Sequence, residues 1–152
     1  MSKIFEQLLK ARGLTPDFLN PKYENLTDPF ILTGMKEAVA RVKTALEKNE
    51  KILIYGDYDV DGVTASTLME EALKLAGFKP DNLGIMLPDR FADGYGMSPR
   101  LIKRALHDGV NLVITVDCGS KNHAIISELN QHKIDSIITD HHETEDEMPD
   151  SI

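Results

Sequence analysis

The chain has 152 residues, of which 41% are hydrophobic and 28% charged, so it can bury a core and has the composition of a globular protein. A single cysteine excludes an internal disulfide framework, and no apolar run approaches the roughly 20 residues that a membrane-spanning helix needs. The net charge of −8 disfavours a nucleic-acid partner at first, but residues 140–152 alone carry six acids and no Lys or Arg. Net charge therefore does not decide the class of partner. The amino terminus has no signal-peptide core, and we expect a cytoplasmic protein with no membrane segment.

Hydrophobic periodicity predicts helices and strands in alternation. The expected elements, in order, are a helix at 3–12, a Pro-punctuated arm, a helix at 34–48, a strand at 51–56, a helix at 62–75, a strand at 83–87, a helix at 99–108, a strand at 111–117, a helix at 121–132 and a strand at 134–139. This alternation is typical of an α/β fold, a parallel sheet with helices on both faces. We expect two regions, the amino-terminal helix and arm at 1–33 and the α/β domain at 34–152.

Three acidic clusters each follow a predicted strand directly. They are GDYDVDG at 56–62, DCG at 117–119 and DHH at 140–142. Because the carboxyl ends of parallel strands share one edge of the sheet, we expect the clusters to meet there. Carboxylates and imidazoles crowded together are poorly paired unless a cation joins them. The sequence therefore predicts a site for divalent metal.

The residue types indicate which metal and which chemistry. Alternate acids at Asp57, Asp59 and Asp61 let at least two carboxylates face one cavity. Asp117, on a neighbouring strand, is suited to bridge two cations at the roughly 3.5–4 Å spacing of two-metal sites. One histidine of the 141–142 pair can ligate through a neutral imidazole, while the other hydrogen-bonds substrate or a leaving oxygen. Oxygen-rich ligation with one imidazole suits Mn²⁺ or Mg²⁺ and the hydrolysis of phosphoryl esters.

Other interpretations of the acidic loop fit less well. An EF-hand loop needs Glu at its twelfth position, where this chain has Leu68. A haloacid-dehalogenase-type nucleophile loop would need a late pair of aspartates, where this chain has Asp140-His141-His142. A solvated turn with Asp61 capping the next helix is a plain alternative for one loop, but it does not account for three clusters.

A fourth motif, PDRFADGYG at 88–96, combines a possible phosphate contact with glycine turns. Arg90 offers a bidentate donor to phosphate, and Tyr95 offers a face on which a base can stack. The alternative is a glycine-punctuated turn in which Arg90 pairs with Asp89 or Asp93. The residues alone slightly favour the turn.

The four motifs together resemble those of the DHH phosphoesterase superfamily. Asp140-His141-His142 corresponds to the motif that names it, and the motifs at 56–62, 88–96 and 117–119 look like the first, second and third of its RecJ branch. The similarity extends upstream through residues 18–21 and 28–30. The resemblance implies the amino-terminal part of a RecJ-like, single-strand-specific 5′ exonuclease of DNA repair and recombination. It also implies two Mn²⁺ or Mg²⁺ ions in the complete protein and, as partners, single-stranded DNA and single-strand-binding or recombination proteins.

The same resemblance implies roles for individual residues. The expected metal ligands are Asp59, Asp61, Asp117 and His141, with Asp57 beside them. His142 corresponds to the histidine that contacts the scissile phosphate, and the expected catalytic residues are His142, Asp61 and Asp117. The expected substrate-binding residues are Arg90, Gly94, Tyr95, Gly96 and His142.

Two departures from the family pattern carry consequences. Other DHH branches place His four residues before the first ligand Asp, where this chain has Tyr55. The family also uses a further ligand Asp and a DHHA1-type lobe downstream, so the sequence leaves open whether these 152 residues are active alone. One alternative is a DHH phosphodiesterase of short oligonucleotides or cyclic dinucleotides. Another is a non-catalytic DHH scaffold, which the intact motifs disfavour.

Overall fold

The computed structural model describes residues 2–91, 96–144 and 147–152. The chain consists of two units, Met1–Met35 and Lys36–Ile152. No helix among the described residues is long and apolar enough to cross a membrane. Each unit is built from local signals that the sequence carries.

The first unit begins with the expected short helix, α1 (Lys3–Ala11), whose start is capped by the Ser2 hydroxyl. Three one-turn 3₁₀ helices follow, η1 (Pro16–Leu19), η2 (Tyr23–Asn25) and η3 (Pro29–Ile31). Proline begins η1 and η3 because its fixed φ suits the first position of a helix, where its missing N–H is not needed. The unit is therefore a string of short turns without a core of its own among the described residues.

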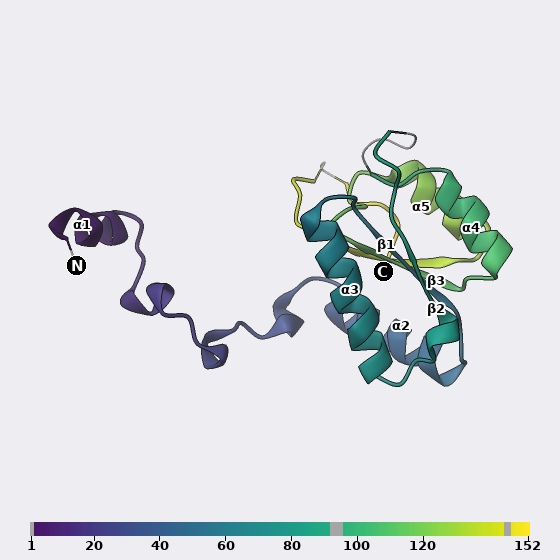
Figure 1. Ribbon diagram of the computed structural model, residues 1–152, viewed down its shortest axis with the longest axis horizontal. Helices are drawn as coiled ribbons and strands as arrows, with labels where there is room; N and C mark the ends of the chain where they lie inside the picture. The colour runs from purple at the N-terminus through teal and green to yellow at the C-terminus, as the bar shows by residue number, and fades with distance from the viewer. Residues whose placement is uncertain (1, 92–95, 145–146) are drawn as a thin grey trace. The chain divides into compact units, whose positions relative to one another are not determined.

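The second unit is built on a four-stranded parallel sheet with strand order β2-β1-β3-β4 (Figure 1). The strands are β1 (Ile52–Gly56), β2 (Leu83–Met86), β3 (Leu112–Val116) and β4 (Asp135–Thr139). Every residue of the two central strands, β1 and β3, is buried, which explains why both are apolar apart from Thr115. The α/β prediction is confirmed.

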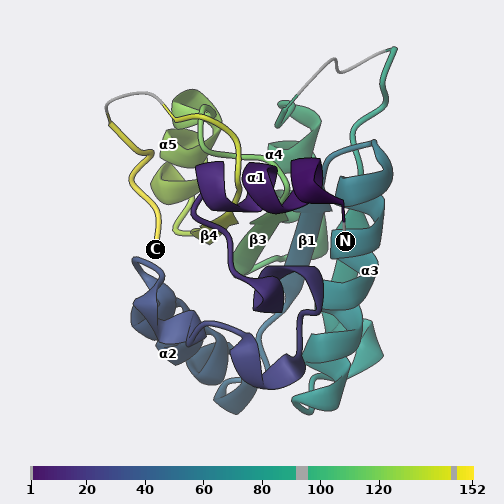
Figure 2. The same ribbon diagram turned by 90° about the vertical axis from the view of Figure 1, so that its left-hand side faces the viewer.

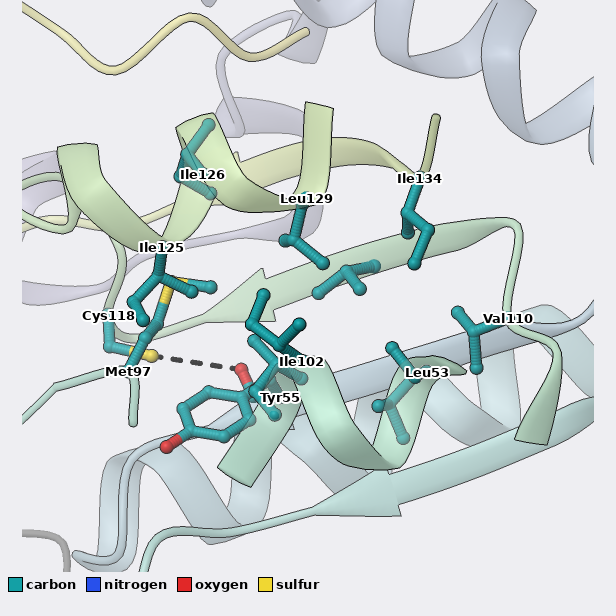
Figure 3. Close-up of a cluster of buried hydrophobic side chains, with 13 residues drawn as sticks. Leu53, Tyr55, Met97, Ile102, Val110, Cys118, Ile125, Ile126, Leu129 and Ile134 are labelled. Carbon is teal, nitrogen blue, oxygen red and sulfur yellow. Dashed lines mark hydrogen bonds between the residues drawn. The ribbon is translucent and has the colours of Figure 1, made fainter. Parts of the chain in front are cut away.

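Helices cover both faces of this sheet (Figure 2). They are α2 (Met35–Glu47), α3 (Val60–Leu75), α4 (Arg100–Asp108) and α5 (His123–Gln131), with a one-turn 3₁₀ helix η4 (Pro80–Asn82) before β2. On one face, α4 and α5 pack on residues such as Leu53 and Val113 (Figure 3). On the other face, α2 and α3 pack on Ile54 and Ile114. Successive side chains of each strand thus point to opposite faces of the sheet and pack into two separate cores.

The register of the strands brings their carboxyl ends to one edge. Gly56 pairs with Val116, and Val116 pairs with Thr139, so β1, β3 and β4 end side by side. The first acid of each cluster, Asp57, Asp117 or Asp140, is the residue that directly follows its strand. The shared edge that the sequence predicts is therefore present.

Close packing between β1 and α3 fixes the first of these clusters. A Cβ atom on Gly62 would lie 2.3 Å from the Asp57 carbonyl oxygen and 2.5 Å from the Asp57 nitrogen. A Cβ atom on Gly56 would lie 2.1 Å from the Ser66 hydroxyl oxygen. Only glycine lets the helix begin directly against the end of the strand.

We expect Gly62→Ala to lower the free energy of unfolding by about 1–3 kcal/mol, because the added methyl group must displace backbone atoms of Asp57. This loss should appear despite the roughly 1 kcal/mol by which a helix interior prefers Ala to Gly. Urea denaturation followed by circular dichroism measures it.

The matched control is Gly84→Ala, whose Cβ would meet the flexible end of the Leu53 side chain at 3.2 Å. Equal stability of the two variants would show that the approach of α3 to Asp57 is not a rigid constraint.

Candidate metal centre

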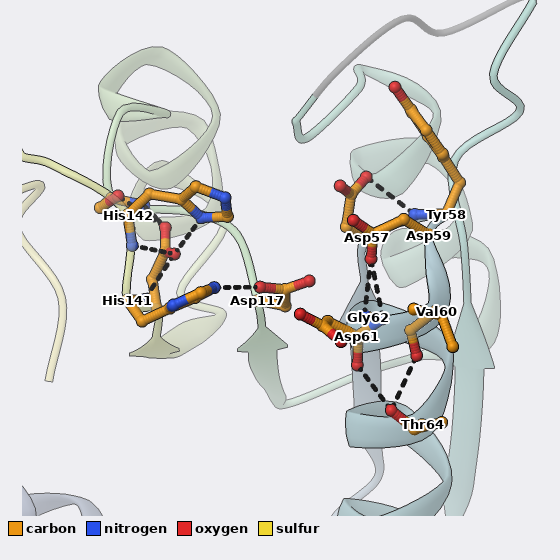
Figure 4. Close-up of polar contacts among 12 residues, drawn as sticks. Asp57, Tyr58, Asp59, Val60, Asp61, Gly62, Thr64, Asp117, His141 and His142 are labelled. Atoms are coloured by element: carbon orange, nitrogen blue, oxygen red, sulfur yellow. Dashed lines mark hydrogen bonds and ion pairs between the residues drawn. The ribbon is translucent and has the colours of Figure 1, made fainter. Parts of the chain in front are cut away.

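The three acidic clusters meet in two overlapping groups of ligand atoms (Figure 4). Oxygens of Asp57, Asp59 and Asp117 lie within 4.8 Å of one another. The same limit of 4.8 Å holds for ligand atoms of Asp117, His141 and His142. Asp117 belongs to both groups, so one carboxylate joins residues from three separate strand ends.

Asp57 and Asp59 are held by hydrogen bonds from the backbone of their own loop. The Tyr58 N–H donates to the buried Asp57 carboxylate at 2.7 Å. The Asp59 carboxylate caps α3, accepting from the N–H groups of Asp61 at 2.9 Å and Gly62 at 3.1 Å. The bond from Gly62 is the main reason that the pKa of Asp59 is lowered. The cap is thus Asp59 and not Asp61, which the solvated-turn alternative had placed there.

Asp61 lies in the first turn of α3, exposed to solvent. It belongs to neither of the ligand groups that the described residues form. It does line an open cavity of about 570 Å³ that also reaches Asp117 and His141, with apolar residues of α3 such as Leu68 along one wall. Its roles as ligand and catalytic residue remain predictions.

Asp117 is held in an unusual backbone conformation at the end of β3. Its φ is +62°, in the left-handed region, where Asp is tolerated better than most residues. Its N–H donates to the Thr139 carbonyl at 2.9 Å, and its side chain is only 7% exposed. Burial raises the pKa of Asp117, and the negative charge of Asp59 raises it further, while His141 acts in the opposite direction. The buried Asp117 carboxylate therefore lacks compensating positive charge.

A divalent cation would supply the positive charge that Asp117 lacks. The group offers carboxylate oxygens and imidazole nitrogens, a donor set that suits Mn²⁺ or Mg²⁺ and lacks the thiolates of structural zinc sites. Cys118, which follows Asp117, packs into the core among apolar residues instead. Burial raises the pKa of its thiol to about 12, so it is a neutral packing residue at neutral pH.

Asp140 organises the histidine pair without belonging to either ligand group of the described residues. One of its oxygens accepts from the Ser120 N–H at 3.1 Å and the Ser120 hydroxyl at 2.6 Å. The other accepts from the N–H groups of His141 at 2.7 Å and His142 at 3.1 Å. Burial opposes its ionisation, but the bonds from Ser120 and His142 outweigh burial and hold the pKa of Asp140 well below its usual range. Asp140 is therefore a charged anchor for the turn.

The two histidines point to different partners (Figure 4). His141 Nε2 lies 2.9 Å from an Asp117 oxygen, and its side chain is 71% exposed. His142 Nδ1 lies 2.7 Å from Asp140, which raises the pKa of His142. A carboxylate that holds one ring nitrogen fixes the tautomer and directs the other nitrogen outward. Sequence reasoning gave Asp140 and Ser120 no such role, although an acid next to two histidines was a usable signal.

Four of the five predicted substrate-binding residues lie on the connection between β2 and α4, and the fifth, His142, follows β4. The Arg90 guanidinium lies over the Tyr58 ring, 5.4 Å from its centroid, a contact that the sequence did not indicate. Gly96 is buried, with φ +85°, and its carbonyl accepts the Tyr55 hydroxyl at 3.1 Å. The other two predicted residues, Gly94 and Tyr95, lie outside the described residues. The substrate contacts themselves remain predictions.

The chain is similar to proteins that process single-stranded DNA. Residues 51–152 match the model of the DHH family, N-terminal domain. The single-stranded-DNA-specific exonuclease RecJ of Bacillus subtilis is 43% identical over 136 residues, which cover 88% of this chain and 16% of that protein. RecJ of Dickeya dadantii is 35% identical over 147 residues, which cover 96% of this chain and 25% of that protein. The chain thus spans 16–25% of the length of these relatives.

Solved structures agree with the sequence relatives. RecJ from Thermus thermophilus in complex with Mn²⁺ superposes with a TM-score of 0.73 at 28% identity, covering 94% of this chain and 19% of that one. A second structure, exonuclease RecJ bound to manganese, gives a TM-score of 0.72 at 33% identity over 79% of this chain and 30% of that one. The family model covers more than half of the chain, and the fold agrees with it. This protein belongs to the DHH family, with residues 51–152 matching the family's N-terminal domain.

Proposed function

We propose that the chain is part of a metal-dependent phosphodiesterase that removes nucleotides from the 5′ end of single-stranded DNA in repair and recombination. The observation that carries the proposal is Asp117, whose carboxylate joins the acidic group to the histidine group. The relatives named as single-stranded-DNA-specific exonucleases support the same activity, and so do the two RecJ structures solved with manganese. An enzyme with this activity would act on DNA in the cytoplasm, with single-strand-binding or recombination proteins as its partners.

The proposed division of labour follows from the two ligand groups. Asp57, Asp59 and Asp117 would hold one Mn²⁺ or Mg²⁺ ion, and Asp117 with His141 would hold a second, with Asp61 at the margin. Such ions, when bound, lower the pKa of water and offset negative charge on a phosphate.

His142 would act on the phosphate itself. Asp140 holds its Nδ1, so the ring is oriented and its protonated form is stabilised. The opposite ring nitrogen can then donate a hydrogen bond to a phosphate oxygen or a leaving oxygen. Arg90, with Gly94, Tyr95 and Gly96 on the same connection, would bind the strand end.

Asp117→Asn should weaken Mn²⁺ binding by more than about tenfold. Substitution of a residue that only contacts a metal ligand already lowers metal affinity by about tenfold or more, and loss of a ligand should cost more. The reason is that one neutral amide replaces the only carboxylate shared by both groups of described ligands. Isothermal titration calorimetry of the metal measures the effect. Asp81→Asn, an exposed acid of η4 at the opposite end of the sheet, is the control and should bind like the parent. Equal binding by the two variants would remove Asp117 from the site.

Metal removal should reverse the order of stability of the parent protein and Asp117→Asn. With a chelator present, Asp117→Asn should melt at a higher temperature than the parent, because it removes a buried charge that faces Asp59. With Mn²⁺ in excess the parent should be the more stable, because a ligand that binds only the folded state raises the melting temperature. Thermal denaturation with and without metal tests this crossing, and parallel shifts of both proteins would contradict it.

Hydrolysis should depend on His142 and start at a 5′ end. His142→Ala should lower the rate about a hundredfold or more, the usual effect of losing an acid–base group. The assay follows Mn²⁺-dependent release of nucleotides from 5′- and 3′-labelled single strands, using this chain and any longer protein that contains it. The control is His132→Ala, an exposed histidine at the end of α5.

The substrates decide between the proposal and its alternatives. Faster cleavage of dinucleotides than of long strands would indicate an enzyme of short oligonucleotides. Intact Mn²⁺ and DNA binding without cleavage, even in the longer protein, would indicate a scaffold.

A further inference from the structure

Two tyrosines, one in β1 and one just after it, contact the connection from β2 to α4. Tyr55 lies in β1, and Tyr58 stands between the acids Asp57 and Asp59. Both contact the connection from β2 to α4, of which residues 87–91 and 96–99 are described. The contacts fall at opposite ends of this connection.

Tyr55 holds the end that leads into α4. Its side chain is fully buried, and its hydroxyl donates to the Gly96 carbonyl at 3.1 Å and accepts from the Ser98 N–H at 3.3 Å. Met97, between these two residues, packs into the core beside Tyr55 (Figure 3). Gly96 also lies against Asn122, since a Cβ on Gly96 would be 3.2 Å from the Asn122 amide. This end of the connection is therefore fixed by bonds and by packing.

The hydroxyl of Tyr55 has a specific role in this arrangement. A phenylalanine would fill the same core volume, but it could neither accept from Ser98 nor donate to Gly96. Both backbone groups are buried, and a buried polar group without a partner is costly. The hydroxyl thus ties the connection to β1 and not merely to the core.

Tyr58 holds the other end. The guanidinium carbon of Arg90 lies 5.4 Å from the centroid of the Tyr58 ring, within the range of a cation–π contact. The Tyr58 backbone is itself fixed, because its N–H donates to the Asp57 carboxylate at 2.7 Å. Figure 4 shows the Tyr58 side chain pointing away from Asp117 and from the start of α3. One residue thus connects a candidate metal ligand to a candidate phosphate contact.

We infer that Tyr58 is a positioning residue that sets where the Arg90 guanidinium stands relative to the metal centre, and so tunes recognition of a terminal phosphate, while Tyr55 holds the other end of the same connection. Arg90 is exposed, so its long side chain has many conformations unless something restricts it. The Tyr58 ring restricts the side chain, while Tyr55 restricts the backbone at the far end of the connection. The inference rests on the proposed function for its single-stranded DNA substrate, to which it adds a 5′-phosphate as the group that Arg90 recognises.

The test compares Tyr58→Leu with Tyr58→Phe, which keeps the ring and is the matched control. We expect Tyr58→Leu to reduce the preference for 5′-phosphorylated over 5′-hydroxyl oligothymidylate by about two- to fivefold, the range of an exposed cation–π contact. Tyr58→Phe should keep the preference, and both variants should bind Mn²⁺ like the parent. The ratio of Mn²⁺-dependent nucleotide release from the two oligonucleotides, by this chain or a longer protein that contains it, gives the preference, and calorimetry gives the metal affinity. An unchanged preference in Tyr58→Leu overturns the inference.

A second readout needs no DNA. Phenylglyoxal should modify Arg90 about two- to fivefold faster in Tyr58→Leu than in Tyr58→Phe, because only the leucine variant uncovers the guanidinium. Tyr55→Phe should speed amide hydrogen exchange at Ser98 by about tenfold, since the Ser98 N–H loses its acceptor. Mass spectrometry and NMR measure the two effects.

The two readouts separate the possible failures. If the parent shows no preference for the 5′-phosphate, the proposed substrate is wrong, while the modification and exchange rates still report on the tyrosines. If Arg90 reacts equally in both Tyr58 variants, or Ser98 exchanges as in the parent, the positioning roles are wrong whatever the substrate is.

Discussion

Repulsion between carboxylates at one edge of the sheet is the constraint around which this structure is organised. Parallel register makes β1, β3 and β4 end together, so Asp57, Asp117 and Asp140 each follow a strand at the same edge of the sheet. Each element nearby reduces the resulting electrostatic cost. The first turn of α3 donates N–H groups to Asp59, and the turn after β3 donates to Asp140. The negative charge that these donors do not offset lies at Asp117, where a cation would complete the site.

Asp117 and Asp140 show how neighbouring strands give the same residue type two different properties. The pKa of Asp117 is raised, mainly by burial, whereas hydrogen bonds lower the pKa of Asp140 although burial opposes them. The difference is the number of donors, because Ser120 and the two histidine N–H groups all face Asp140. Asp140 is satisfied by the protein and serves to orient side chains. Asp117 is not, and it is therefore the better candidate for a metal ligand of the two.

Much of this arrangement could be predicted from the sequence. Apolar runs located the strands to within one or two residues, and the rule for parallel strands placed the acidic clusters at one edge. The helix cap could not be predicted, because Asp59 and Asp61 are equivalent in type and only the extended backbone of Asp59 decides between them. The contact of Tyr58 with Arg90 was equally hidden, since it depends on strand order, which periodicity does not encode. The division at 1–33 and 34–152 remains a prediction.

The left-handed backbone at position 117 has a consequence for how this family can change over time. Most side chains are strained at φ +62°, but Asn adopts this conformation about as readily as Asp and has nearly the same shape. The codons of Asp and Asn differ by a single base. A folded descendant with an uncharged residue at the centre of its ligand set is therefore one mutational step away, with no unstable intermediate to cross. Loss of the proposed metal binding and loss of the fold are therefore separable at this position.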